Sequence, residues 1–152
     1  MTEQKNTAEF DHEEYNRAVK AARLLDVALT ASNFTLKSEY FSPNDTARRL
    51  SSDYTLVDCS FDGSHLILLV RFVIEAKESN KKLLKCKCDY NVIYAFGESD
   101  ISEAAAKSFG THIAQFTAYP YFRQHVSQLS WESGADLPIL PVLKRMPMKK
   151  KE

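Results

Sequence analysis

Two long runs between Ser64 and Phe96, each with an apolar residue at every second position, constrain the fold more than any other feature of this chain. Alternation with a period of two places every second side chain on one face of a β-strand, so both runs predict strands with a buried face. Asp62-Gly63 precedes the first run and Ser79-Asn80 separates the two, and both pairs are typical of tight turns. The residues expected on the buried face are Leu66, Leu68, Val70, Phe72, Ile74, Ala76, Leu84, Cys86, Cys88, Tyr90, Val92, Tyr94 and Phe96.

Two further strands are expected before these runs. The first begins near residue 24, and the second covers residues 54–61 after a turn-rich connection at 42–52. Four consecutive strands joined by short connections predict an antiparallel sheet. In the first of these strands, the apolar residues expected to share a face are Val27, Leu29 and Ala31, followed by Phe34 and Leu36. In the second strand they are Thr55, Val57, Cys59 and Phe61. The turn-forming residues of the connection are Pro43, Asn44 and Asp45.

Helices are expected before and after the strands. Asp11 and Glu14 have the spacing of a capping box, and apolar residues then recur at helical spacing to about residue 24. Asp100 and Glu103 repeat this signal for a helix that Gly110 and Pro120 should limit. A further helix is expected from Tyr119 to a C-cap at Gly134.

The expected fold class is therefore α+β, with a four-stranded antiparallel sheet, an N-terminal helix and C-terminal helices packed on one side. The length of 152 residues predicts a single domain over residues 1–152. Residues 1–10 are polar, and basic residues crowd the segment 144–152, so both ends are expected to be disordered.

The composition and the scattered functional groups point away from catalysis. Twenty basic residues balance twenty acidic ones, which gives no overall signal for nucleic acid. Cys86 and Cys88 fall on one strand face, but the other ligands of a zinc site are missing, so we expect core packing. No catalytic constellation or cofactor motif is present. We therefore expect a non-enzymatic protein with no cofactor. The sequence has no apolar leader and no membrane span, and its three cysteines are an odd number, so we expect reduced thiols and a cytoplasmic location.

A distinctive motif follows the expected sheet. Tyr119-Pro120-Tyr121-Phe122-Arg123 forms an aromatic, proline-bearing helix segment, and Leu137-Pro138-Ile139-Leu140-Pro141-Val142-Leu143 follows it. The two prolines of the second segment exclude helix and favour an extended conformation. An apolar extended segment of this kind suits the wall of a groove.

This motif, following four strands, resembles the SecB family of export chaperones. The resemblance implies ATP-independent holding of unfolded polypeptides in hydrophobic grooves by a dimer of dimers. Gln124 stands where the family usually has Glu after the Arg. The export members of the family are acidic and bind the SecA motor, whereas this chain has no net charge, so coupling to SecA is not expected. An N-terminal helix and too few residues after Leu143 for a further helix make the chain more similar to the SecB-like chaperones of toxin–antitoxin–chaperone modules.

The resemblance implies a set of residues that bind the client polypeptide. Tyr119 and Tyr121 would hold the base of the apolar segment, and Arg123 would have a structural role. The complete expected set is Val57, Cys59, Phe61, Tyr119, Tyr121, Leu137, Ile139, Leu140, Val142 and Leu143. On this interpretation the client is an unfolded polypeptide or an antitoxin, and Ile67, Leu69 and Val73 on the outer face of the sheet could be buried in an oligomer interface.

The sequence leaves three alternative functions open. The chain could be an export chaperone that delivers preproteins to SecA. It could instead be a small-ligand-binding α+β domain in which Leu137–Leu143 closes a pocket. A structural adaptor that docks on RNA through the basic tail is the third alternative.

Overall fold

The computed structural model describes residues 12–42, 48–97 and 100–143. The expected connection residues Pro43, Asn44 and Asp45 and both predicted disordered ends lie outside the described residues. Within these ranges the elements are helix α1 (His12–Ala21), strand β1 (Arg23–Leu36), the 3₁₀ helix η1 (Ser38–Phe41), strands β2 (Arg48–Phe61), β3 (His65–Glu78) and β4 (Lys81–Ala95), and helix α2 (Glu103–Ser133). The predicted α+β class is confirmed.

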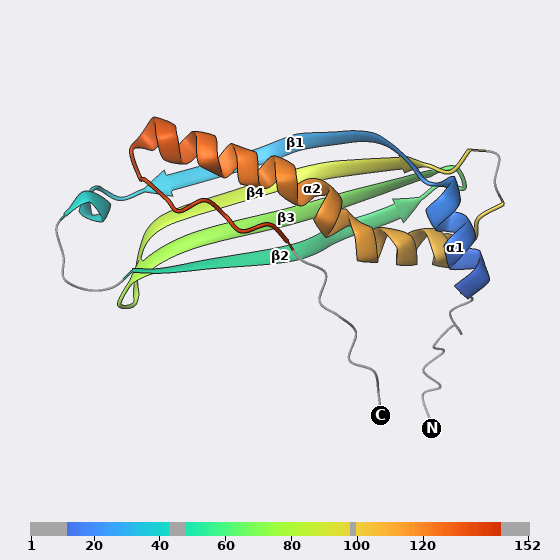
Figure 1. Ribbon diagram of the computed structural model, residues 1–152, viewed down its shortest axis with the longest axis horizontal. Helices are drawn as coiled ribbons and strands as arrows, with labels where there is room; N and C mark the ends of the chain where they lie inside the picture. The colour runs from blue at the N-terminus through green and yellow to red at the C-terminus, as the bar shows by residue number, and fades with distance from the viewer. Residues whose placement is uncertain (1–11, 43–47, 98–99, 144–152) are drawn as a thin grey trace, which may run out of the picture.

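The described strands form one antiparallel sheet in the order β1-β4-β3-β2. Strand β1 therefore pairs with β4, and the chain must cross one end of the sheet between β1 and β2. The two runs that the sequence marks most clearly, β3 and β4, are the central strands. Figure 1 shows α2 lying across the sheet, with residues 134–143 returning beside it on the side of β2.

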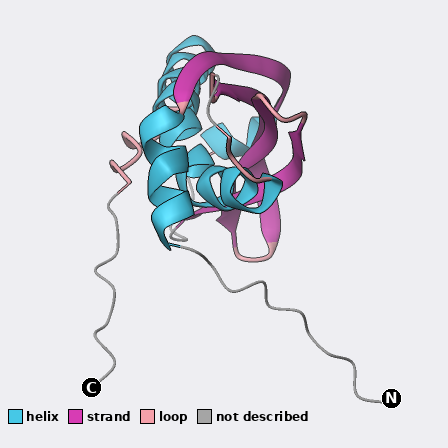
Figure 2. Ribbon diagram, turned by 90° about the vertical axis from the view of Figure 1, so that its right-hand side faces the viewer, coloured by secondary structure: helices cyan, strands magenta, loops and turns pink. Residues whose placement is uncertain are grey.

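One face of the sheet forms the core, as expected from the alternation in β3 and β4. Every second residue of these strands, from Leu66 to Ala76 and from Leu84 to Tyr94, is buried. The ring of Phe122 on α2 stacks on Phe72 at 4.8 Å between ring centroids. Both helices lie on this face of the sheet (Figure 2), so the other face is not covered by any described element.

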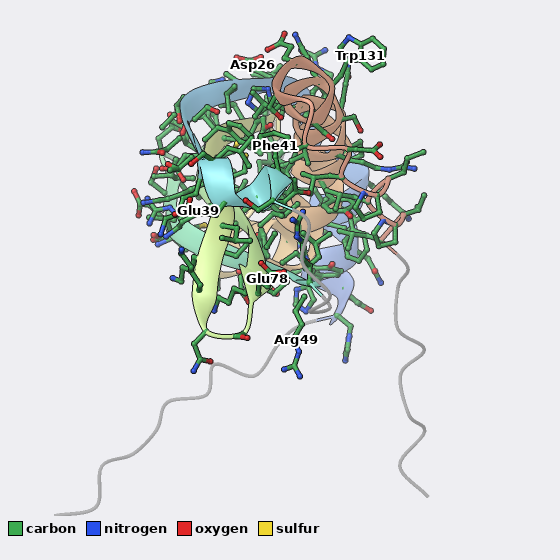
Figure 3. The ribbon with its side chains drawn as sticks, turned by 90° about the vertical axis from the view of Figure 1, so that its left-hand side faces the viewer. Asp26, Glu39, Phe41, Arg49, Glu78 and Trp131 are labelled. Atoms are coloured by element: carbon green, nitrogen blue, oxygen red, sulfur yellow. The ribbon has the colours of Figure 1, made fainter. Side chains whose placement is uncertain are left out.

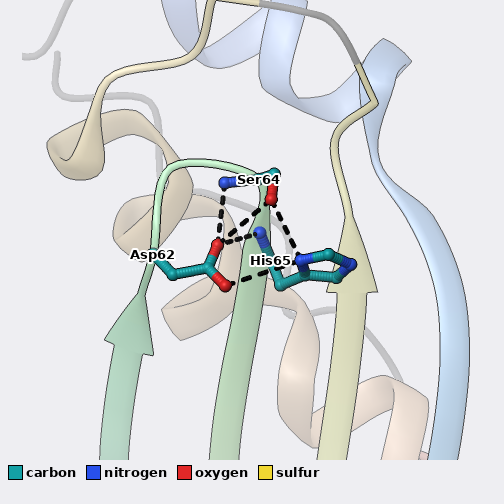
Figure 4. A network of polar contacts seen from close by, with 3 residues as sticks. All are labelled: Asp62, Ser64 and His65. Atoms are coloured by element: carbon teal, nitrogen blue, oxygen red, sulfur yellow. Dashed lines mark hydrogen bonds and ion pairs between the residues drawn. The ribbon is translucent and has the colours of Figure 1, made fainter.

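The turns that join the strands form as predicted. Gly63 has a φ of 102°, a conformation that favours glycine. The Asp62 carboxylate accepts hydrogen bonds from the backbone N–H groups of Ser64 (2.9 Å) and His65 (2.6 Å), which closes the turn between β2 and β3 (Figure 4). Ser79 and Asn80 make the connection between β3 and β4.

The second strand is longer than predicted. Residues 48–52 are predicted in a turn-rich connection, but they belong to β2 and pair with the second half of β3, for example Ser51 with Glu75. The local sequence is polar and has little strand propensity. The neighbouring strand β3 supplies the hydrogen-bond partners, and this tertiary pairing overrides the local preference.

The prediction of two C-terminal helices is wrong, because α2 runs without a break from Glu103 to Ser133. Pro120 lies inside this helix, whose two halves meet at a bend (Figure 1). The buried side chains of Ala118, Tyr119 and Phe122 hold the helix against the sheet on both sides of the proline. This packing offsets the hydrogen bond that a proline removes.

The caps of the helices differ in part from the expectation. Ser102, rather than Asp100, is the N-cap of α2, and its side chain accepts a hydrogen bond from the Ala105 N–H at 3.2 Å. Glu14 of α1 accepts a hydrogen bond from the Ser102 backbone N–H at 3.1 Å and so ties α1 to the start of α2. The capping role of Asp11 lies outside the described residues. Gly134 ends α2 in the left-handed conformation, as predicted.

Two irregularities change the faces predicted for β1 and β2. The register of β2 shifts between Leu56 and Asp58, so Val57 has no cross-strand partner. Tyr54, Leu56, Cys59 and Phe61 pair with core residues of β3, whereas Thr55 pairs with Arg71 of the outer face. In β1 a shift at Thr30 likewise places Ala31 on the face opposite to Leu29. The predicted groupings of Thr55 and Val57 with Cys59, and of Ala31 with Leu29, are therefore wrong.

Candidate functional site

The apolar segment after α2, residues 135–143, is fixed to the helix by hydrogen bonds to its backbone. We call it the extended segment. The Ser130 hydroxyl accepts from the Leu137 N–H at 2.7 Å, the Arg123 Nε donates to the Leu140 carbonyl at 2.7 Å, and the Tyr119 hydroxyl donates to the Pro141 carbonyl at 2.6 Å. These three residues of α2 are four and seven positions apart and share one face of the helix. The predicted structural roles of Tyr119 and Arg123 agree with these contacts.

A fourth hydrogen bond holds the start of the extended segment. The buried Tyr40 of η1 donates its hydroxyl proton to the Ala135 carbonyl at 2.7 Å. The guanidinium of Arg48 lies over the Tyr40 ring, 4.0 Å from its centroid. The crossing connection between β1 and β2 thus reaches the extended segment.

The backbone bonds determine which apolar side chains of the extended segment face solvent. Leu140 points into the core and is only 6% exposed, and Leu137 and Leu143 are half-buried against the core. Ile139 and Val142 are 77% and 63% exposed. Of the predicted client-binding residues in this segment, Leu140 is thus a core residue, while Ile139 and Val142 are open to contact.

A cleft of about 400 Å³ separates the C-terminal half of α2 from the extended segment. Its most prominent side chain is Trp131, the single tryptophan of the chain, which is 88% exposed and projects outward at the end of α2 (Figure 3). Asp136, held at a φ of 49°, adds a carboxylate to a lining that is otherwise largely apolar or small. The lining consists of Val126, Ser127, Ser130, Trp131, Gly134, Asp136, Leu137, Pro138 and Ile139.

The predicted residues of β2 do not share this cleft. Phe61 packs its ring edge-on against Phe96 at 5.7 Å, and Phe96 in turn contacts Phe109 in the first half of α2. Cys59 also lies near the start of α2, close to the charges of Lys107 and Glu103, and burial raises the pKa of its thiol. Val57 is exposed at the irregularity in β2. The structure thus divides the predicted set between the two halves of α2.

Tyr121 lies on the other flank of α2 and does not hold the extended segment. It lines a hollow of about 260 Å³ between α2 and β1, together with Val27, Leu29, Tyr90, Gln124, His125 and Gln128. His125 Nε2 is 2.9 Å from the Ser32 hydroxyl of β1. The role predicted for Tyr121 at the base of the extended segment is therefore wrong.

Only Leu137 and Ile139 of the cleft belong to the predicted set, and Trp131 and Ser130 are the most informative of the residues that were not predicted. A signal for Trp131 existed, because it falls outside the apolar stripe of Phe122, Val126 and Leu129. A tryptophan off the buried stripe of an amphipathic helix faces solvent unless a partner covers it. The hydrogen bond of Ser130 depends on how the chain returns after Gly134, which no local pattern reveals.

The buried sulfur atoms form part of the core. Cys86 Sγ and Cys88 Sγ are 3.6 Å apart and both side chains are buried, in agreement with the expected core packing. The contact with the Cys88 thiol, together with burial, raises the pKa of Cys86. Among the residues that the structure describes, no group of three or more His, Cys, Asp or Glu side chains could hold a metal ion. No helix within the described ranges is long and apolar enough to cross a membrane.

Comparisons with known proteins bear on the fold. No family model matches the sequence, and no curated protein matches it. The fold is similar to that of a solved SecB-like chaperone from Mycobacterium tuberculosis, which is in complex with a ChAD peptide from the HigA1 antitoxin. The two structures have a TM-score of 0.75 and 15% sequence identity, and the match covers 90% of this chain and 99% of that chain. A protein of unknown function from Streptococcus agalactiae covers 82% of this chain with a TM-score of 0.34, which is too low to inform the fold. The resemblance inferred from the C-terminal motif is thereby confirmed for the fold: the described part of the chain has the fold of a SecB-like chaperone.

Proposed function

We propose that this protein is an ATP-independent chaperone that holds non-native polypeptide in the cleft between α2 and the extended segment. The observation that carries this proposal is that Ile139 and Trp131, two solvent-exposed apolar side chains, line the cleft, while Val142 is exposed further along the same fixed segment. Four hydrogen bonds hold the extended segment in place, so its exposed side chains cannot simply retreat into the core. Large apolar side chains exposed at a cleft are typical of a binding site for a partner.

The cleft suits a client of variable sequence. Its lining is largely apolar, and burial of apolar surface is non-directional, so different client side chains can use it. Each large apolar client side chain that becomes buried contributes roughly 1.5–3 kcal/mol. Holding a client requires no bond to be made or broken, and we assign no enzymatic activity or cofactor to the protein.

The client that we propose is an aggregation-prone antitoxin. The support comes from the structural neighbour, which was solved with a peptide from an antitoxin and shares this fold. On this proposal the protein acts in the cytoplasm, where it keeps the antitoxin able to neutralise its toxin. The alternative within the same class is an export chaperone, for which tight binding to SecA would be required.

We further propose that the protein works as a homo-oligomer that pairs through the edge strand β1. Strand β2 forms the other edge of the described sheet and carries Arg48, Arg49, Asp53 and Asp58. Charged residues on an edge strand discourage pairing with another chain. Strand β1 carries only Arg23 and Asp26, along with the exposed apolar side chains of Leu24, Leu25 and Leu29, so it is the edge better suited to pairing.

The proposed function can be tested through Trp131. A reduced, carboxymethylated polypeptide without tryptophan serves as a permanently unfolded model client, so the tryptophan fluorescence of the mixture comes from Trp131 alone and reports on the cleft. Client binding should shift the emission of Trp131 to shorter wavelength, because an exposed indole becomes buried. Replacing Trp131→Ala should weaken client binding by roughly tenfold or more, the loss typical of a central aromatic residue.

Phe116→Ala is the matched control, because Phe116 is an exposed aromatic residue on the other half of α2. It should leave client affinity within about twofold, and neither substitution should change stability by more than about 0.5 kcal/mol. Equal client affinity for the Trp131→Ala protein and the unsubstituted protein would contradict the assignment of the cleft.

Partner isolation separates the remaining alternatives. The antitoxin proposal predicts that a small antitoxin co-purifies with the protein and aggregates without it. An antitoxin that is soluble alone, together with tight SecA binding, would favour the export alternative. A monomer that carries a defined small molecule in native mass spectrometry would favour a small-ligand-binding domain.

A further inference from the structure

The outer face of the sheet, opposite to α2, has an organised pattern of charge and apolar surface. Strands β3 and β4 present alternate residues to this face, in rows defined by the cross-strand pairs. One end of the face, near the turn between β3 and β4, is basic. The other end, around the pair Ile67 and Ile93, is apolar. No described element covers either end (Figure 2).

Four lysines and one carboxylate form the basic end. Glu75 lies 3.2 Å from Lys82, 3.3 Å from Lys77 and 3.8 Å from Lys85, and Lys87 follows one row further along β4. A single carboxylate can neutralise one lysine, so three positive charges remain. Asp53 is nearby, but it is on edge strand β2 with Val73 between it and Lys87, and Arg49 on the same strand offsets its charge.

Cross-strand ion pairing accounts for only part of the lysine charge, because Lys82 and Lys85 share the single carboxylate of Glu75. Lys77 and Lys82 are direct cross-strand partners, and like charges placed opposite each other destabilise a sheet. Lysines also protect edge strands from pairing, but β3 and β4 are the central strands, so that explanation does not apply. Glu75 lies close to both Lys77 and Lys82 and offsets part of their repulsion, and an anionic partner would offset more of it.

The other end of the outer face carries exposed apolar side chains. Ile67 is 42% exposed although it lies on a central strand, and its neighbours on the same face are Leu69 and Ile93. Val73 continues the apolar surface towards the lysines. Between the two ends, Arg71 and Asp89 satisfy each other through two hydrogen bonds of 2.8 and 3.0 Å. From Ile93 to Lys85 the face spans roughly 25 Å, at about 3.3 Å for each residue of a strand.

From this pattern we propose that the outer face of the sheet binds an acidic amphipathic segment of another protein. The carboxylates of the partner would lie over Lys82, Lys85 and Lys87, and its apolar side chains would cover Ile67, Leu69 and Ile93. Nucleic acid fits less well, because no aromatic side chain of the described strands lies on this face to stack on a base. This surface is on the opposite side of the sheet from the proposed client cleft and does not depend on it.

The test uses a short fluorescein-labelled peptide with a run of glutamates followed by leucines, added to the full-length protein. The variant K85Q/K87Q removes two charges from the basic end while leaving Lys77 and Lys82 paired with Glu75. It should weaken binding of the peptide by roughly fivefold, and added salt should weaken the unsubstituted complex. The matched control R17Q/K20Q removes the same charge from exposed positions of α1 and should leave the affinity unchanged. Backbone amide shifts in a titration should fall on β3 and β4.

Three outcomes would overturn the proposal. The first is equal weakening in K85Q/K87Q and R17Q/K20Q, which would show attraction to overall charge. The second is a set of amide shifts confined to Trp131 and the extended segment, which would place the peptide in the cleft. The third is tighter binding of an oligouridine RNA than of the peptide at the same lysines. Because Trp131→Ala should not affect the peptide, failure of this proposal is distinguishable from failure of the proposed client site.

Discussion

Gly110 shows how one residue determines the distance between α2 and the sheet. A Cβ atom at this position would lie 2.8 Å from a methyl group of Leu68 and 2.9 Å from a methyl group of Leu66, both of which are fully buried. The sequence pattern suggested that this glycine interrupts a helix. In the structure it lies within α2, where the absence of a side chain lets the helix approach β3.

Gly110→Ala should therefore destabilise the protein although alanine favours helix. The gain in helix propensity is about 1 kcal/mol, and overpacking of a tight core costs about 1–3 kcal/mol. We expect the free energy of unfolding, measured by urea denaturation, to fall by about 1 kcal/mol. Leu68→Val makes room for the new methyl group, so the double variant L68V/G110A should lose less stability than the sum of the single variants. Strict additivity would contradict the close approach.

At the scale of elements, the extended segment owes its position to one face of α2. Tyr119→Phe removes the hydrogen bond to the Pro141 carbonyl and should lower the free energy of unfolding by about 1 kcal/mol. It should also increase proteolytic cleavage after residue 137, because the end of the segment is released. Tyr121→Phe is the matched control, since this tyrosine lies on the other flank of α2, and it should behave like the unsubstituted protein. Equal protease sensitivity of the two variants would contradict the proposed attachment.

Strands β3 and β4 are joined on the outer face by Arg71 and Asp89, and this pair predicts a pH dependence. The hydrogen bonds from Arg71 hold the pKa of Asp89 below its ordinary value. A carboxyl group whose pKa is lowered by folding stabilises the folded state above the unfolded-state pKa of about 3.9, and the contribution disappears as the pH falls through the lower folded-state pKa.

Asp89→Asn should accordingly lower the free energy of unfolding at neutral pH by on the order of 1 kcal/mol. The difference from the unsubstituted protein should shrink as the pH falls below about 3.9. Urea denaturation over a pH series measures this difference. Asp53→Asn, a change at an exposed position of the same face, should show a smaller effect at neutral pH. A difference for Asp89→Asn that stays constant down to strongly acidic pH would exclude the ion pair as its cause.

The elements differ in how far the sequence could predict them. Strands β3 and β4 were predictable because their alternation and their turn residues, such as Gly63 and Ser79, are local signals. The irregularities at Val57 and Thr30 were not, because an extra residue in one strand is defined only by its partner strand. The continuity of α2 through Pro120 depends on packing against the sheet. For the site, the apolar segment could be recognised, but its division into buried Leu140 and exposed Ile139 depends on hydrogen bonds from α2.

At the scale of the whole molecule, the two edges of the described sheet are unequal, and the proposed assembly follows from this difference. Leu25→Glu places a charge on β1 and should shift the protein towards a monomer in light scattering. Leu50→Glu is the matched control, because it introduces the same charge at an exposed leucine of β2. It should leave the oligomer unchanged. Dissociation by Leu50→Glu alone would place the interface at the other edge.

The hydrogen bonds that hold the extended segment also have a kinetic consequence. Because Tyr119, Arg123 and Ser130 fix the segment before any client arrives, the conformational entropy lost on binding falls mainly on the client. No opening step needs to precede the encounter. The observed association rate should then rise in proportion to client concentration without reaching a plateau, and clients should differ chiefly in how long they stay bound.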